Sequence, residues 1–130
     1  MKNIFINVSN HPSDKWSKAQ TEAAKEHYID CRIIDVKFPN VPSAANRTEI
    51  VEIAKSVEKQ VSEICDREQA VNVRAMVQGE MTLTFALVQV LVARSIRCYA
   101  GCSERISKIN TDGSKTASFE FVQFRPYSFI

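Results

Sequence analysis

Two kinds of apolar pattern alternate along most of the chain. Short runs rich in β-branched and aromatic residues are typical of strands, whereas apolar residues recurring every three or four positions are typical of helices with one buried face. The first pattern predicts strands over residues 3–8, 30–38, 70–77 and 96–100. The second predicts helices that begin at Ser13 or Asp14, at Thr48 and at Thr82, and end near residues 28, 64 and 95.

Beyond residue 105 the pattern predicts a β-hairpin. Residues 106–109 and 117–124 are strand-like and flank Thr111-Asp112-Gly113-Ser114, and Asp-Gly between two such runs is a strong hairpin signal. The predicted order is therefore βαβαβαβ followed by a hairpin, which favours right-handed crossovers and a parallel sheet between helices. We expect an α/β protein with a Rossmann-like three-layer fold, as one domain over residues 1–130 with a βα core (1–105) and a C-terminal hairpin (106–125).

Composition and net charge restrict the kinds of ligand that the protein is expected to bind. The chain has 130 residues, of which 45% are apolar and 25% charged, and a formal net charge of +2. Such a chain is the size of one globular domain. A net charge so near zero provides no strong basic field for long nucleic acid, but a few local cations are enough to hold a small anionic ligand.

The cysteines and the absence of targeting segments indicate a compartment. No C-x-x-C pair occurs, so we expect structural thiols rather than a zinc site, and no cofactor. The chain shows no export leader and no run long enough to span a bilayer, which predicts a cytoplasmic protein without a membrane partner. The cysteines are Cys31, Cys65, Cys98 and Cys102.

Three polar segments follow predicted strands, and in an open parallel sheet the ligand crevice lies beyond the carboxyl ends of the strands. The first segment is the leading candidate, because a plain connection needs neither an imidazole, an ammonium group nor an indole. The alternative is a capped turn with Trp16 packed beneath it. This segment consists of Ser9, Asn10, His11, Pro12, Ser13, Asp14, Lys15 and Trp16.

The other two segments offer phosphate contacts. In the second, Gly79 permits close approach to the backbone, and free amides at the following helix N-terminus favour a phosphate; Thr82 is alternatively an ordinary N-cap. In the third, residues 101–105, we expect a loop whose Arg105 forms a bidentate phosphate contact or, alternatively, a surface ion pair. All three segments should meet at one edge of the domain.

The third predicted helix indicates self-association. From Leu83 through Ala93 almost all of its residues are apolar, so this helix has almost no polar face. A helix that is apolar all round is buried on every side, and in so small a domain part of that surface is expected to meet a second copy. A two-fold axis near this helix would join two ligand edges into one pocket.

Several stretches resemble a known family. Ser-Asn-His-Pro-Ser-x-Lys-Trp at residues 9–16, Gly-Glu-Met-Thr-Leu-Thr-Phe-Ala-Leu at 79–87 and Ser-Glu-Arg at 103–105 are similar to small CRISPR-associated Rossmann-fold (CARF-like) proteins of type III systems. The resemblance covers nearly the whole chain. It implies a homodimer that binds a cyclic oligoadenylate second messenger, with cyclic tetra-adenylate the expected ring. Some such proteins are ring nucleases that end the antiviral response, and others only bind the messenger.

The resemblance leads us to expect a metal-independent ring nuclease, in which a ribose 2′-hydroxyl attacks the adjacent phosphorus and leaves a linear product with a 2′,3′-cyclic phosphate. We expect His11 to transfer protons, because imidazole titrates near neutral pH. Lys15 and Arg105 would stabilise the developing charge. Glu80 is a second candidate base, and His27 is expected on a helix away from the site. The expected ligand contacts are Ser9, Asn10, Ser13, Trp16, Gln78, Gly79, Glu80, Met81, Thr82 and Ser103, with Trp16 and Met81 as adenine walls.

Two other functions stay open. A non-catalytic binder of the same messenger, acting as a sponge or sensor, would use the same phosphate and ribose contacts. A protein for another nucleotide is the third possibility. Dinucleotide cofactors are disfavoured, because the glycine fingerprint is missing and the first strand–helix connection is short.

Overall fold

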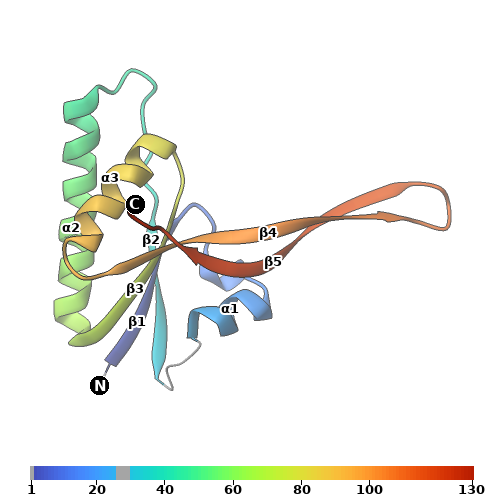
Figure 1. Cartoon of the computed structure of the whole chain (residues 1–130), viewed down its shortest axis with the longest axis horizontal. Coiled ribbons are helices and arrows are strands. Elements are labelled where there is room, and N and C mark those ends of the chain that lie inside the picture. Colours follow the sequence, from blue (N-terminus) through green and yellow to red (C-terminus); the bar gives the residue numbers. More distant parts are fainter. Residues whose placement is uncertain (1, 26–29) are drawn as a thin grey trace.

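The computed structural model describes residues 2–25 and 30–130 and contains a five-stranded sheet with helices on both faces (Figure 1). The first four strands are parallel and the last is antiparallel. The predicted α/β class, with its mostly parallel sheet and C-terminal hairpin, is confirmed. The elements are β1 (Lys2–Ser9), the short 3-10 helix η1 (Ser13–Lys15), α1 (Lys18–Lys25), β2 (Cys31–Lys37), α2 (Arg47–Glu68), β3 (Ala70–Gln78), α3 (Met81–Val92), β4 (Arg97–Ile109) and β5 (Lys115–Pro126).

The strand order reverses beside β1. The sheet has the order β2-β1-β3-β4-β5, so the chain leaves β1 to one side and returns on the other. Ser9, the last residue of β1, lies opposite Lys37 of β2 and Gln78 of β3. The carboxyl ends of β1 and β3 therefore adjoin at the reversal, which is where open α/β sheets bind ligands.

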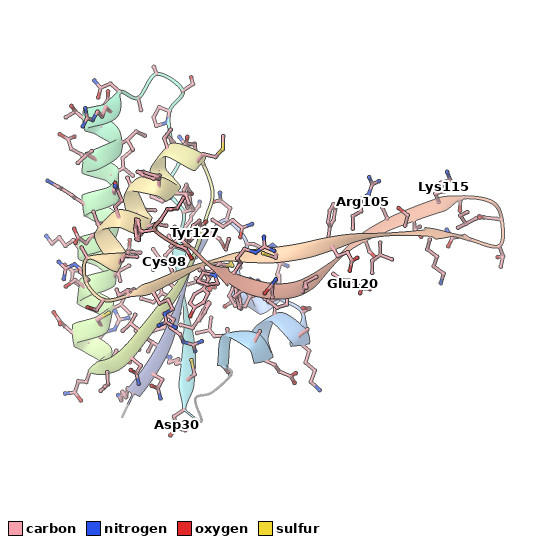
Figure 2. The ribbon with its side chains drawn as sticks, viewed as in Figure 1. Asp30, Cys98, Arg105, Lys115, Glu120 and Tyr127 are labelled. Carbon is pink, nitrogen blue, oxygen red and sulfur yellow. The ribbon has the colours of Figure 1, made fainter. Side chains whose placement is uncertain are left out.

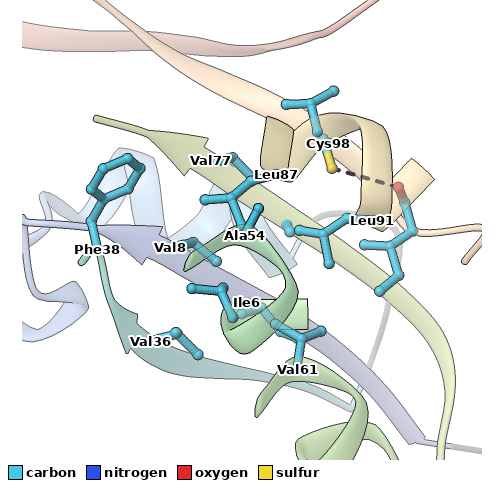
Figure 3. Close-up of a cluster of buried hydrophobic side chains, with 14 of the residues drawn as sticks. Ile6, Val8, Val36, Phe38, Ala54, Val61, Val77, Leu87, Leu91 and Cys98 are labelled. Atoms are coloured by element: carbon cyan, nitrogen blue, oxygen red, sulfur yellow. Dashed lines mark hydrogen bonds between the residues drawn. The ribbon is translucent and has the colours of Figure 1, made fainter. Parts of the chain in front are cut away.

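The two faces of the sheet have different cores. Successive strand residues point to opposite faces, and in β1 Ile4, Ile6 and Val8 belong to the cluster that α2 and α3 cover (Figure 3). Phe5 instead packs with Trp16 and other residues on the α1 side. We call these the α2–α3 face and the α1 face.

Two predicted helix starts are wrong, because other side chains cap the helices. Asn46, not Thr48, caps α2: its side chain accepts the Glu49 N–H at 2.9 Å, and the Glu49 carboxylate accepts the Asn46 N–H at 3.3 Å. This reciprocal pair is a capping box. In α3 the N-cap is Glu80 rather than Thr82.

The first helix also begins later than predicted. Ser13–Lys15 form only the 3-10 turn, and Trp16 has an extended backbone. Trp16 is 8% exposed, so burial of its indole separates the turn from α1. α1 begins at Lys18, with the Ser17 hydroxyl accepting the Gln20 N–H at 3.2 Å. The predicted helix end near residue 28, and His27, lie outside the described residues.

The largest correction concerns the C-terminal hairpin. β4 is continuous from Arg97 to Ile109, so residues 101–105 form strand rather than the predicted loop. The sequence pattern does not indicate a strand at residues 101–105, because these residues are mostly small or polar. The apolar side chains of the β4–β5 pair come mainly from β5. We call residues 103–121 the arm, which projects away from the helices (Figure 1). In residues 2–25 and 30–130, no helix is both long and apolar enough to cross a bilayer.

Candidate ligand site

The α1 face changes from apolar to polar toward the carboxyl ends of its strands. Phe5 of β1 and Met76 of β3 pack beneath α1. Two residues further along the same strands and on the same face lie Asn7 and Gln78, and Ser9 follows Asn7. Asn7 is 1% and Ser9 8% exposed. Buried polar side chains need hydrogen-bond partners, and here the partners lie in the loop after β1.

Asn7 is the centre of a network that fixes this loop. Its amide nitrogen donates to the carbonyl oxygen of His11 at 2.9 Å and to Asp35 Oδ1 at 3.1 Å. Its Oδ1 accepts the Ser9 hydroxyl at 2.6 Å, and Ser9 Oγ accepts the His11 N–H at 3.1 Å. The Asp35 carboxylate accepts the Ser13 N–H at 3.2 Å. The loop backbone is therefore fixed by hydrogen bonds at both the N–H and the carbonyl oxygen of His11, and again at the Ser13 N–H.

Beside this loop lies an open groove of about 790 Å³, which we call the α1-side groove. It is lined by the first polar segment, the start of α1, the end of β3 and the hairpin. The lining brings together the first predicted segment, only Gln78 of the second, and Gly101 and Ser103 of the third. The predicted site residues that line it are Ser9, Asn10, His11, Lys15, Gln78 and Ser103.

Gly101 keeps the floor of the α1-side groove open. Its N–H donates to Gln78 Oε1 at 2.9 Å. A Cβ on Gly101 would lie 3.2 Å from Met76 Sδ, closer than side chains normally approach, and in ordinary contact with Gln78 Oε1 at 3.4 Å. Gly101 lines the groove together with Gln78 and Ser103.

The groove has an aromatic wall that the sequence analysis did not assign. Phe119 and Phe121 of β5 line it, as does Gln20 of α1. Phe119 is 75% exposed. The i, i+2 spacing of these two phenylalanines on one strand could have indicated a shared face.

Trp16 and Ser13 lie outside the lining of the α1-side groove. The Trp16 ring is 6.2 Å from the Phe5 ring, edge to face, and 6.0 Å from the Phe124 ring. Trp16 therefore supports the site from beneath, as in the alternative interpretation, and does not form the expected adenine wall. Ser13 contributes its backbone N–H to the loop network.

After Gln78, the second predicted segment lies outside the lining of the α1-side groove. The Glu80 carboxylate accepts the Thr82 and Leu83 N–H groups at 3.0 and 2.8 Å and the Thr82 hydroxyl at 2.6 Å. These hydrogen bonds, from the Thr82 side chain first, hold the pKa of Glu80 below its usual value. The expected free amides are thus already occupied by a carboxylate, which would also repel a phosphate.

Gly79 makes room for the Phe38 ring. A Cβ there would lie 2.6 Å from the Phe38 ring, so only glycine admits this ring. Met81 is 84% exposed and lines a second hollow of about 360 Å³, together with Phe85 of α3 and Phe129 of the C-terminal tail.

Arg105 is separated from the other predicted catalytic residues. It lies in the arm opposite Phe119 of β5, beyond the lining of the α1-side groove (Figure 2). His11 and Lys15 remain as the predicted catalytic residues that line the groove.

Two of the cysteines have thiols that burial makes harder to ionise. Burial raises the pKa of the Cys98 thiol to about 12, and burial also raises that of Cys65. All four cysteines are free. A raised pKa disfavours the nucleophilic thiolate. Within the described ranges, 2–25 and 30–130, no three histidine, cysteine or acidic side chains gather as a metal site.

The fold and this geometry define an α/β protein with a polar and aromatic groove at the strand-order reversal. Residues 3–125 match the family model described as "Uncharacterized protein MJ1673 family". The chain belongs to that family. No curated protein matches the chain.

Proposed function

We propose that the protein is a CARF-like ring nuclease that binds cyclic oligoadenylate in the α1-side groove and cleaves it without a metal ion, as a homodimer in the cytoplasm. The observation that carries the proposal is the meeting of His11, Lys15 and Gln78 beside the β1/β3 reversal. An imidazole, an ammonium group and amides suit the ribose and phosphates of such a ring. The CRISPR-associated resemblance of residues 9–16, 79–87 and 103–105 supplies the substrate class.

The proposed reaction needs no external nucleophile. The ribose 2′-oxygen forms a bond to the adjacent phosphorus, the bond from phosphorus to the 5′-oxygen breaks, and the products are a 2′,3′-cyclic phosphate and a 5′-hydroxyl. His11 passes the proton from the 2′-hydroxyl toward the leaving 5′-oxygen, and the Lys15 ammonium stabilises charge on the non-bridging oxygens. The Asn7 network holds the His11 backbone in place for this step.

The exposed apolar surface around α3 supports the homodimer. Met81, Phe85 and Phe129 are 84%, 64% and 65% exposed, and they surround the hollow of about 360 Å³. Gln78 lines both this hollow and the α1-side groove, so a second copy seated on α3 would lie next to the ligand. Sedimentation should therefore detect a dimer that Phe85→Glu weakens.

Product analysis with cyclic tetra-adenylate tests the activity. Excess ring, incubated with the protein and EDTA and resolved by liquid chromatography with mass spectrometry, should yield linear products ending in 2′,3′-cyclic phosphate over many turnovers. His11→Ala should slow cleavage by about 10²–10⁴-fold. A stable stoichiometric complex with the intact ring would instead identify a non-catalytic binder. Thermal stabilisation by NAD or ATP but not by cyclic oligoadenylates would contradict the substrate class.

A further inference from the structure

A β-bulge brings three phenylalanines of β5 onto one face. Phe124 lies opposite Gly101 of β4, and Phe121 opposite Ser103, with a register shift between Cys102 and Ser103. In a regular strand, residues three apart point to opposite faces. The extra residue of the bulge restores the alignment, so the rings of Phe121 and Phe124 lie 4.9 Å apart. Phe119, two residues further, continues the row.

Only the inner end of this row belongs to the core. The Phe124 ring lies 5.0 Å from that of Phe5 and 6.3 Å from that of Tyr99. Phe121 and Phe119 extend from it over the α1-side groove, which both of them line. Their neighbours across the strand pair are small near the body, since Ser103 lies opposite Phe121, whereas Arg105 lies opposite Phe119. Directly opposed residues project from the same face, so Arg105 adds a cation at the outer end.

We propose that Phe119 and Phe121 form a stacking shelf for the purine bases of the ligand. The inference rests on the proposed function and extends it from the ribose and phosphates to the bases. Aromatic side chains in a groove with nearby cations are a common way to hold the bases of a flexible or cyclic oligonucleotide. The α1-side groove combines these groups, since Lys15 and His11 line it together with Phe119 and Phe121. Arg105 holds a phosphate that extends past Phe119.

The position of the shelf favours a nucleotide over a purely apolar partner. The two rings share one continuous groove with Gln20, Gln78 and His11, so an occupant meets hydrogen-bonding groups and aromatic faces together. A purine nucleotide presents that combination. The groove volume of about 790 Å³ lies in the usual range for small-molecule sites.

Binding measurements with leucine and tryptophan variants test the shelf. Phe119→Leu and Phe121→Leu should each weaken binding of fluorescently labelled cyclic tetra-adenylate by about tenfold, because leucine keeps apolar bulk but loses the π-face. Phe119→Trp should retain affinity, and its indole fluorescence should be quenched on binding. The matched control is Ile109→Ala, since Ile109 is a 71% exposed residue of β4 outside the groove lining. It should bind as the wild type does. Circular dichroism and thermal melting establish that each variant is folded.

The outcomes separate the shelf from the proposed function. If the wild-type protein binds the ring and both leucine variants bind equally well, the shelf is wrong and the function stands. If the wild-type protein binds only linear oligoadenylate or AMP, and the leucine variants lose that binding, the shelf stands and the cyclic substrate is wrong. Loss of self-association without loss of ligand affinity would show that the rings contact a second copy, and no binding of any purine nucleotide at millimolar concentration would overturn both proposals.

Discussion

The α2–α3 face and the α1 face are built on the same strands but carry different chemistry. On the α2–α3 face, Ile6 and Val8 of β1 are fully buried against a continuous apolar cluster. On the α1 face, the eight-residue helix α1 and the aromatic cluster around Phe5 cover only part of the sheet, and the strand ends carry Asn7 and Ser9. Strand alternation allows this separation. Substitutions on one face should therefore affect stability, and substitutions on the other should affect ligand chemistry.

The largest effect on stability is expected for Leu87→Ala. Leu87 of α3 has no exposed surface and lies in the cluster of the α2–α3 face (Figure 3). Removing its side chain should lower the free energy of unfolding by about 2–5 kcal/mol. Urea denaturation measures this loss. Phe119→Leu, at a 75% exposed residue of the α1-side groove, should cost less than about 0.5 kcal/mol. Equal losses would show that the two faces are not separated.

Asn7→Leu should affect both stability and activity. Its loss leaves the His11 carbonyl oxygen, the Ser9 hydroxyl and Asp35 without their Asn7 partner. We expect a loss of about 1–3 kcal/mol in the free energy of unfolding. Because the loop that carries His11 would shift, ring cleavage should fall on the order of a hundredfold.

Asn72→Leu is the matched control for this change. Asn72 Nδ2 donates to Asn3 Oδ1 at 2.9 Å, near the amino ends of β1 and β3. This variant should lose stability but keep the cleavage rate of the folded protein. If the two asparagine variants reduced cleavage alike, the Asn7 network would have no special role at the site.

Gly79→Ala should destabilise the protein through Phe38. The added methyl group would lie 2.6 Å from the Phe38 ring, so the ring must move. Overpacking of this kind costs about 1–3 kcal/mol. Combining the change with Phe38→Leu should recover part of the loss, which a double-mutant cycle in urea would quantify. Simple additivity of the two changes would argue against the contact.

The smallest effect is expected for Glu80→Gln, and it should depend on pH. Hydrogen bonds from Thr82 and Leu83 lower the pKa of Glu80 in the folded protein from its usual 4.5. A lowered pKa contributes stability that is present above the unfolded pKa and is lost as pH falls through the folded value. The variant should therefore show a shallower acid decline in melting temperature than the wild type. Parallel pH profiles would show that the carboxylate does not stabilise α3.

The order of the elements was predictable because each strand run and each helical pattern is long enough to show its period. The starts of the helices were harder to predict. Asn46 with Glu49 three residues later is a capping box that the sequence shows, whereas Glu80 is an uncommon N-cap residue. Residues 101–105 were misassigned because a strand paired only with β5 needs few apolar residues of its own.

Only those residues of the candidate site whose positions follow from the ends of the strands were predictable. The β1/β3 reversal brings His11, Lys15 and Gln78 together from the topology alone. Asn7 and Asp35 required knowledge of side-chain contacts, although each is a polar residue inside an apolar strand. Phe119 and Phe121 required the bulge and the continuous β4, neither of which the sequence pattern indicated.

Hydrogen–deuterium exchange with and without saturating cyclic tetra-adenylate would locate the ligand directly. We expect slower exchange in residues 9–15, 101–103 and 119–121, with α2 unchanged. Protection confined to α2, or an exchange profile that the ring does not alter at all, would contradict binding in the α1-side groove.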